Sequence, residues 1–281
     1  MAVPQPTLAP TSLAPVERVL PDGSSAAVSE VVAEEVPVAL VYNGISHVVM
    51  MATPADLVDF GLGFSLSEGI IERADELYDI AVAVVENGIE VRMSIALDRF
   101  ATLKERRRSI AGRTGCGLCG VESLKEAVRH YAPIDSELRF RIEAINAALA
   151  ELPKRQTVNR ATGSVHAAAW TSPSGAIVLV REDVGRHNAF DKLIGALAWR
   201  GMLGVPGFAV ITSRCSVEMV QKAAAAGIPL LVAISAPTAL ARRLADECRL
   251  TLVALARRDS LLIVTHPWRL DRDRDPERLA S

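Results

Sequence analysis

The stretch "GFAVITSRCSVEMVQKAAAAGIPLLVAI" (residues 207–234) decides the fold class of this 281-residue chain. Two continuous apolar runs, 207–212 and 230–234, flank a segment with helical spacing, 216–227, that ends at Gly227. Apolar runs without polar alternation are typical of parallel strands that are buried on both faces. The stretch therefore predicts a strand, a helix and a second strand.

The same alternation continues on both sides of this stretch. A helical pattern over 237–248 and an apolar run over 250–255 follow it, and a strand over 176–180 and a helix over 188–201 precede it. Short connections between alternating strands and helices indicate a parallel sheet that is covered by helices on both faces. We therefore expect an α/β domain over residues 156–270.

Polar segments follow three of the predicted strands where each strand ends, at 181–187, 213–216 and 235–238. Ligands of open α/β sheets bind outside the carboxyl ends of the strands, where helix N-termini offer free N–H groups and a positive dipole. The three segments therefore favour a phosphate-bearing ligand. The alternative is that their Ser, Asp, Pro and Thr residues serve only as helix caps. The basic side chains in these segments are Arg181, Arg186 and Arg214.

The first half of the chain has a different pattern. Residues 39–51 and 79–97 predict two β-hairpins, each turned at an Asn-Gly pair that tolerates positive φ. The segment 53–71 between them predicts a helix with Thr53 as its cap and Pro54 at its first position. These elements indicate a smaller, mixed α+β subdomain N-terminal to the α/β domain.

The subdomain is expected to span residues 17–155 and to include a long, basic, glycine-rich loop at about 104–120. Two further helical patterns follow this loop, a stripe from Val121 to Tyr131 and the segment 136–152.

Composition places the chain among globular proteins, since 50% of its residues are hydrophobic and 23% are charged. A net charge of −2 gives no general preference for nucleic acid or anionic membranes. The N-terminus lacks a signal-peptide pattern, and four cysteines are too few for a disulfide scaffold, so we expect a cytoplasmic protein. Residues 1–16 are expected to form a disordered, proline-rich tail and 271–281 a charged tail.

A cysteine pair, Cys116 and Cys119, lies in the stretch "GRTGCGLCGVES" (residues 112–123). A structural zinc site usually needs two such pairs, whereas Cys215 and Cys248 are single, so we expect no metal site. The deaminase signature H-x-E followed by P-C-x-x-C is also absent from the sequence. A redox pair of the thioredoxin type follows a strand directly, and here a basic loop precedes the pair, although the helical pattern after it fits.

A nucleophilic or carrier thiol is the third alternative for this pair. Cys119 begins a predicted helix, whose N-terminal dipole favours the reactive thiolate, and Arg113 and the run 106–108 add positive charge. A glycine-rich loop would let the thiol reach one partner and then another, as a sulfur carrier requires. The purely structural alternative is a tight turn that contains two small residues.

Ordered motifs along residues 36–268 resemble those of the FdhD family, the sulfurtransferases required for formate dehydrogenase activity. The resemblance implies a cytidine deaminase-like C-terminal α/β domain without deaminase chemistry. It also implies a cytoplasmic, commonly dimeric protein that takes sulfur from a cysteine desulfurase. The family passes that sulfur to the molybdenum cofactor, bis(molybdopterin guanine dinucleotide), before this cofactor enters formate dehydrogenase. The motifs are "TPADLVDFGLGFSLSEGII", "GCGLCG", "TGSVHAA", "EDVGRHNAFDKLIG", "SVEMVQKAAAAGIPLLVAISAPTALA" and "THPWR".

The resemblance assigns roles to particular residues. It implies that Cys116 carries the persulfide and that Cys119 assists or shares the sulfur. A guanine dinucleotide carries phosphates, which fits the polar segments at the predicted sheet edge. We therefore expect its site to be lined by Arg186, His187, Arg214 and Ser216. The family's cofactor-binding stretch falls on Leu255, Ala256, Arg257, Arg258, Asp259 and Ser260.

Several polar residues in the same motifs have two interpretations each. His187 is either a ligand-facing residue or a core histidine bonded to the backbone, and Lys192 either reaches a phosphate or is solvated. Asp183 and Asp191 could be helix caps or surface charges. His166 is a second-rank candidate for the site.

Three positions depart from the family's pattern. Ser213 stands where glycine is usual before the 216–227 helix, and serine lacks glycine's tolerance of positive φ. Arg258 replaces another glycine, and Val264 replaces tyrosine. These departures make the nucleotide contacts a weaker expectation than the cysteine chemistry. Two other functions stay open, a non-catalytic chaperone that binds the finished cofactor and a dithiol oxidoreductase.

Overall fold

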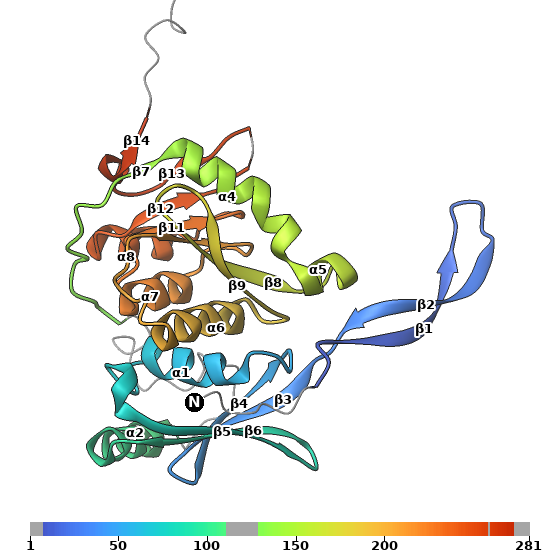
Figure 1. Ribbon diagram of the computed structural model, residues 1–281, viewed down its shortest axis with the longest axis horizontal. Helices are drawn as coiled ribbons and strands as arrows, with labels where there is room; N and C mark the ends of the chain where they lie inside the picture. The colour runs from blue at the N-terminus through green and yellow to red at the C-terminus, as the bar shows by residue number, and fades with distance from the viewer. Residues whose placement is uncertain (1–7, 111–128, 258, 273–281) are drawn as a thin grey trace, which may run out of the picture.

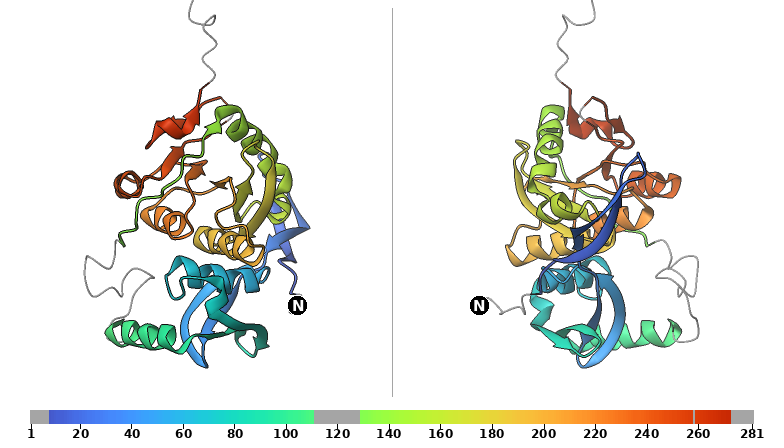
Figure 2. Two further views of the ribbon diagram at one scale, coloured as in Figure 1. Left: turned by 60° about the vertical axis from the view of Figure 1, so that its left-hand side comes forward. Right: turned by 90° about the vertical axis from the view of Figure 1, so that its right-hand side faces the viewer.

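The computed structural model describes residues 8–110, 129–257 and 259–272 (Figure 1). Four strands near the N-terminus form one sheet, and six strands of the second half form another. Helices α1 (Leu57–Ser67) and α6 (Arg186–Trp199) lie between the two sheets, as Figures 1 and 2 show. A β-hairpin projects from this body.

The N-terminal sheet has the strand order β4-β3-β6-β5. Both predicted hairpins are confirmed, and the first turns at Asn43 and Gly44, where φ is 46° and 81°. Strands β3 and β6 pair in parallel at the centre of the sheet. Leu57 and Phe60 of α1 pack on one face of the sheet and are buried. The strands are β3 (Val36–Tyr42), β4 (Ile45–Ala52), β5 (Leu77–Val85) and β6 (Gly88–Ile95).

Two predicted boundaries in this subdomain are wrong. Helix α1 begins at Leu57, and Thr53 does not cap it, because the Thr53 hydroxyl accepts a hydrogen bond from the Val184 N–H at 3.1 Å. The loop expected from residue 104 is helical up to residue 110, since α2 spans Leu97–Ile110. The short helix η1 (Ala74–Glu76) precedes β5.

The second sheet is mixed, with the order β13-β12-β11-β10-β8-β9. Only β10, β11 and β12 pair in parallel, so the expected all-parallel sheet is wrong. Strand β8 is antiparallel to both β9 and β10, because a short turn at Gly175 returns the chain directly into β9. The strands are β8 (His166–Thr171), β9 (Ile177–Asp183), β10 (Phe208–Ile211), β11 (Leu230–Ala233), β12 (Thr251–Ala254) and β13 (Leu262–Ile263).

Helices cover both faces of this sheet, as the sequence predicts, so the α/β class of the second half is confirmed (Figure 2). Helices α6, α7 (Val217–Ala225) and α8 (Ala239–Glu247) bury apolar side chains against one face. Helix α4 (Ile142–Arg155) covers the other face, and α5 (Thr157–Thr162) follows it. The remaining elements are β7 (Phe140–Arg141), η2 (Pro267–Arg269) and β14 (Leu270–Asp271).

Helices α1 and α6 approach each other closely through two glycines. A Cβ added at Gly63 would lie 1.7 Å from the Asp191 carbonyl oxygen, and one at Gly195 would lie 1.9 Å from the Asp59 carbonyl oxygen. Neither obstacle is a flexible side chain, so any larger residue must push the helices apart. The contact between the two halves of the molecule thus depends on these glycines.

We expect Gly195→Ala to lower the free energy of unfolding by more than about 3 kcal/mol, the upper range for overpacked cores. The measurement is urea unfolding followed by circular dichroism. Gly204→Ala is the control, since its Cβ would meet nothing within 4 Å and only its φ of 84° carries a cost, about 1 kcal/mol. Equal stabilities for the two variants would contradict the close packing of α1 on α6.

The projecting hairpin, which we call the arm, consists of β1 (Thr11–Val19) and β2 (Ser25–Ala33). The disorder expected through residue 16 is therefore wrong for residues 11–16, whose amides pair with β2. Residues 1–7 and the charged tail from 273 onward lie outside the described part of the chain. No helix among the described residues is long and apolar enough to cross a membrane.

Candidate functional site

Four connecting loops meet at one edge of the six-stranded sheet. Strands β9 to β12 all run in the same direction, so their carboxyl ends share this edge. Two backbone hydrogen bonds join the loop after β10 to the loop after β11. The Cys215 N–H donates to the Ala236 carbonyl at 3.2 Å, and the Thr238 N–H donates to the Cys215 carbonyl at 3.0 Å. The Leu255 N–H donates to the Ser235 carbonyl at 3.2 Å, which adds the loop after β12. The predicted gathering of polar segments at one edge is confirmed.

Arg186 and His187 begin α6 at this edge. The Arg186 Nε and the His187 Nε2 are both buried, and neither has a hydrogen-bond partner within the described part of the chain. The interpretation of His187 as a core histidine bonded to the backbone is therefore wrong for Nε2. Buried polar atoms without partners are costly in a folded protein, so these two atoms are candidates for contact with a bound ligand.

Burial and, after it, the positive charge of the neighbouring Arg186 lower the pKa of His187 to about 4. We expect an NMR titration of the His187 ring to show a midpoint near pH 4, with the ring neutral at pH 7. Between pH 6.5 and 4 the unfolded chain binds a proton that the folded chain does not, so this histidine reduces stability as the pH falls. Arg186→Gln should raise the midpoint, and a midpoint at 6.5 in the parent protein would contradict the burial of the ring.

Ser216, Arg214 and His166 also lie at this edge. Ser216 is buried directly before α7 and makes no side-chain cap bond, while the Arg214 side chain is exposed. His166 pairs with Asp183 across β8 and β9, and burial, followed by the charge of Arg186, lowers its pKa. Ser213 does not have positive φ, so the loss of the usual glycine there causes no backbone strain. The four residues expected to line the site, Arg186, His187, Arg214 and Ser216, thus all lie in segments at this one edge.

The stretch 255–260 follows β12 at the same edge. Leu255 has a φ of 46°, Ala256 is buried, and Arg257, Asp259 and Ser260 are exposed. The Arg257 N–H donates to the Ser260 carbonyl at 2.8 Å and closes this loop. Arg258 lies outside the described residues. Val264 packs against the core under α6 to α8, so its departure from the family's pattern affects packing.

A buried ion pair that the sequence did not reveal lies behind the site. The Lys192 Nζ is 2.6 Å from the Asp183 carboxylate, and both side chains are fully buried. The Lys192 Nζ also donates to the Thr53 carbonyl at 2.9 Å, and the Thr53 N–H donates to Asp183 at 3.0 Å. Asp183 further accepts from the Gly185 N–H at 2.7 Å and from Asn188 at 3.0 Å. Lys192 therefore neither reaches a phosphate nor is solvated, but joins the two subdomains.

A second buried network joins α7 to the end of α1. The Lys222 Nζ is 2.8 Å from Asp191 and 3.0 Å from Glu68, so Asp191 is neither a cap nor a surface charge. Ser67 donates to Asp191 at 2.6 Å. Burial opposes the ionisation of Glu68, but Lys222 and Arg129 outweigh it and lower its pKa to about 2. Arg129, which also pairs with Glu68, is the first described residue after the cysteine segment.

Comparison with known proteins decides the family. The pattern that defines the FdhD/NarQ family matches residues 33–271, most of the chain. The chain belongs to this family. It is 56% identical over 242 residues to the sulfur carrier protein FdhD of Cupriavidus necator, a match covering 86% of this chain and 84% of the relative. It is 53% identical over 240 residues to the sulfur carrier protein FdhD of Variovorax paradoxus, a match covering 85% and 86% of the two chains.

A solved structure supports the same assignment. The crystal structure of a putative formate dehydrogenase accessory protein from Desulfotalea psychrophila superposes with a TM-score of 0.75 at 25% identity. The match covers 94% of this chain and all of the other. The match to the FdhD/NarQ family includes both sheets and the loops of the candidate site, whereas nearly all of the arm precedes residue 33.

The cysteines of this FdhD/NarQ member differ in reactivity. Cys215 and Cys248 are fully buried free thiols, and burial raises the pKa of Cys215 to about 12 and also raises that of Cys248. Both are poor nucleophiles at neutral pH, because the thiolate is the reactive form. Cys116 and Cys119 lie outside the described residues. The described ranges contain no group of three or more residues that could hold a metal ion.

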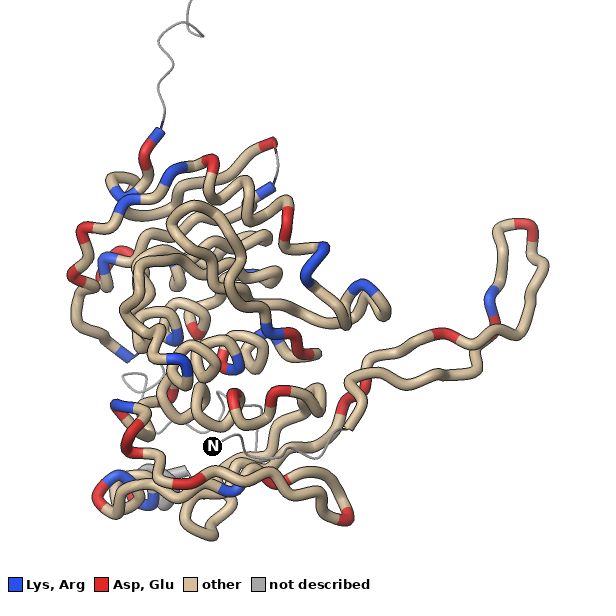
Figure 3. The backbone as a smooth tube through the Cα atoms, viewed as in Figure 1, with Lys and Arg blue, Asp and Glu red and all other residues tan. Residues whose placement is uncertain are grey.

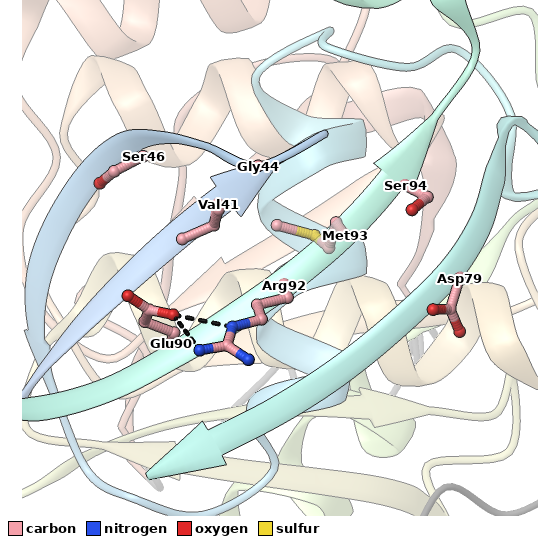
Figure 4. A pocket seen from close by; sticks show the side chains of 8 residues that line it. All are labelled: Val41, Gly44, Ser46, Asp79, Glu90, Arg92, Met93 and Ser94. Carbon is pink, nitrogen blue, oxygen red and sulfur yellow. Dashed lines mark hydrogen bonds and ion pairs between the residues drawn. The ribbon is translucent and has the colours of Figure 1, made fainter. Parts of the chain in front are cut away.

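A hollow also lies away from this sheet edge. A hollow of about 290 Å³ lies on the N-terminal sheet, between β3, β5 and β6 (Figure 4). Arg92 lies within it and donates to Glu90 of the same strand at 2.8 Å, and Asp79 lies across from them. Arg92 and Glu90 are thus paired with each other, and none of the residues predicted for the site line the hollow.

Proposed function

We propose that this chain is a sulfur carrier that takes sulfur from a cysteine desulfurase as a persulfide on Cys116. It then transfers the sulfur to the molybdenum cofactor, bis(molybdopterin guanine dinucleotide), for formate dehydrogenase. The observation that carries this proposal is the match, over most of both chains, to relatives named sulfur carrier protein FdhD. The inert character of Cys215 and Cys248 supports it, because it leaves Cys116 and Cys119 as the candidates for nucleophilic thiols.

Loading of the carrier is a thiol exchange without net oxidation. The Cys116 thiolate attacks the terminal sulfur of the donor's persulfide, a new S–S bond forms on Cys116, and the donor cysteine leaves as a thiolate. Delivery of that sulfur as sulfide needs two electrons. Attack of the Cys119 thiolate on the Cys116 Sγ supplies them and leaves a disulfide, which a dithiol reductant then reopens. Cys119 is thus proposed to assist release.

The sheet edge is proposed to hold the cofactor as a substrate. The buried Arg186 Nε–H, which has no partner among the described residues, is a donor suited to phosphate or base oxygens, and the neutral His187 ring donates there when its proton is on Nε2. The N-terminus of α7 at Ser216 offers further N–H groups. The stretch 255–260 borders the same loops. With phosphates held there, ordered binding rather than metal chemistry of the protein would direct the transfer.

The remaining expectations accompany this proposal. The protein is proposed to act in the cytoplasm, to dock with a desulfurase and then with formate dehydrogenase, and to share the cytidine deaminase-like architecture that the resemblance implies. Whether sulfur transfer counts as enzymatic turnover depends on the reopening of the disulfide. A homodimer is the proposed assembly.

Arg214→Ala tests the nucleotide part of the proposal. Because Arg214 is exposed at the sheet edge, we expect the variant to bind a guanine nucleotide about tenfold more weakly, as for loss of one charge-assisted contact. Persulfide formation should be unchanged. The measurement is isothermal titration with GDP, and Arg243→Ala, an exposed arginine of α8, is the matched control. Equal affinities for all three proteins would remove Arg214 from the site.

A further inference from the structure

Helix α2 ends close in sequence to the cysteine pair. It spans Leu97–Ile110, and Cys116 is the sixth residue after its end. A fully extended chain covers at most about 3.6 Å per residue, so Cys116 lies within about 22 Å of the end of α2. Any protein that transfers a sulfur atom to Cys116 therefore comes close to this helix.

The first half of α2 is fixed to the N-terminal subdomain. Leu103 is buried in the core of that subdomain, and Phe100 packs against it. The Arg99 guanidinium is 2.9 Å from the Glu72 carboxylate and 3.0 Å from the Glu76 carboxylate, so its charge is matched within the subdomain. In both views of Figure 2 the helix extends sideways from the N-terminal sheet.

The second half of α2 carries an excess of positive charge. The run "KERRR" (residues 104–108) contains four basic residues and one acidic residue, and Figure 3 shows basic positions along this helix. The Lys104 side chain is exposed, and its Nζ lies 5.6 Å from the centre of the Phe100 ring. A basic run with so few matching acids attracts negatively charged surfaces and speeds their encounter.

We propose that the second half of α2, residues 104–110, is the docking surface for an acidic face of the protein that donates sulfur to Cys116. This inference rests on the proposed function, because it concerns the loading of that cysteine. Complementary charges mainly speed association and set orientation, and add less to affinity. Docking on α2 would bring the donor's persulfide within reach of Cys116.

The phosphates of the cofactor fit this surface less well than an acidic protein does. Phosphate binds where free N–H groups and the positive end of a helix dipole meet, as at the N-termini of α6 and α7. The basic run lies in the C-terminal half of α2, where the free backbone groups are carbonyls and the dipole is negative. Long cationic side chains on such a helix suit a broad acidic surface.

The test is the rate at which Cys116 gains a sulfur from a cysteine desulfurase and cysteine, followed by intact mass. We expect Lys104→Glu/Arg108→Glu, two positions one helical turn apart, to load at least about tenfold more slowly at low salt. Loading of the parent protein should slow as salt is added. Arg242→Glu/Arg243→Glu, which reverses two exposed arginines of α8, is the matched control and should load at the parent rate. Circular dichroism melting checks that both variants are folded.

A small sulfur donor separates docking from the reactivity of the thiol. With free cysteine persulfide in place of the desulfurase, the parent protein and both variants should load at the same rate. If Lys104→Glu/Arg108→Glu loaded equally slowly from both donors, the charges would act on the Cys116 thiolate and the docking role would be overturned. Parent-like loading of this variant from the desulfurase, or a parent rate that salt leaves unchanged, would also overturn it. A parent protein that gains sulfur from neither donor would instead contradict the proposed function itself.

Discussion

Cys116→Ala is expected to reduce formate dehydrogenase activity in a host that depends on this chain to below about 1% of the parent level. Removal of a covalent nucleophile leaves no atom on which the sulfur can be carried. Cys119→Ala should retain partial activity, since loading needs only one thiolate while release uses the second. The measurement is formate-dependent dye reduction in extracts of a strain that lacks its own copy.

Cys248→Ala is the matched control for this prediction. It removes the same thiol group, but from a fully buried position where burial raises the pKa, and activity should stay close to that of the parent. If Cys116→Ala activated the dehydrogenase normally while still binding GDP, the chain would act as a chaperone for the finished cofactor. If both Cys116→Ala and Cys119→Ala failed, and the parent protein cycled a Cys116–Cys119 disulfide with thioredoxin without ever gaining a sulfur from a desulfurase, dithiol oxidoreduction would replace sulfur transfer.

Lys192→Met is expected to lower the free energy of unfolding by about 3–5 kcal/mol, the usual cost of breaking a buried ion pair. The substitution leaves the Asp183 carboxylate fully buried without its cation, and it removes the bond to the Thr53 carbonyl. The double variant Lys192→Met/Asp183→Asn should recover part of this loss, since no uncompensated charge is then buried. The measurement is urea unfolding at pH 7.

Lys154→Met is the control, because Lys154 pairs with Glu151 on the exposed surface of α4. Its loss should change the free energy of unfolding by no more than about 0.5 kcal/mol. A Lys192→Met protein with parent stability but weakened GDP affinity would contradict the structural role. It would restore the interpretation in which this lysine reaches a phosphate.

The elements that local sequence determines were predictable. The Asn43-Gly44 and Asn87-Gly88 turns specify both N-terminal hairpins, and the apolar runs of residues 207–255 specify the strands whose ends form the site. Arg186, Arg214 and Ser216 could be grouped because the carboxyl ends of strands that run in the same direction meet at one edge of an α/β sheet. This grouping did not require knowledge of any distant contact.

Features that depend on long-range packing were not predictable in this way. Lys192 is buried because Thr53, 139 residues earlier in the chain, covers it. A distant contact also affects where α1 begins. The Thr53 hydroxyl accepts a hydrogen bond from the Val184 N–H and therefore does not cap the helix. The position of β8 between β9 and β10 also depends on a distant partner, β10, that no local pattern specifies. A lysine five residues after a half-buried histidine gives no local sign that it is part of the core.

The most direct test of the central claim is the intact mass of the purified protein after incubation with a cysteine desulfurase and cysteine. Cys116→Ala, Cys119→Ala and Cys248→Ala are measured beside it. We predict the gain of one sulfur that a reductant removes, retained in Cys248→Ala and lost in Cys116→Ala. An unmodified parent protein, or a sulfur that stays in Cys116→Ala, would contradict a persulfide carried on Cys116.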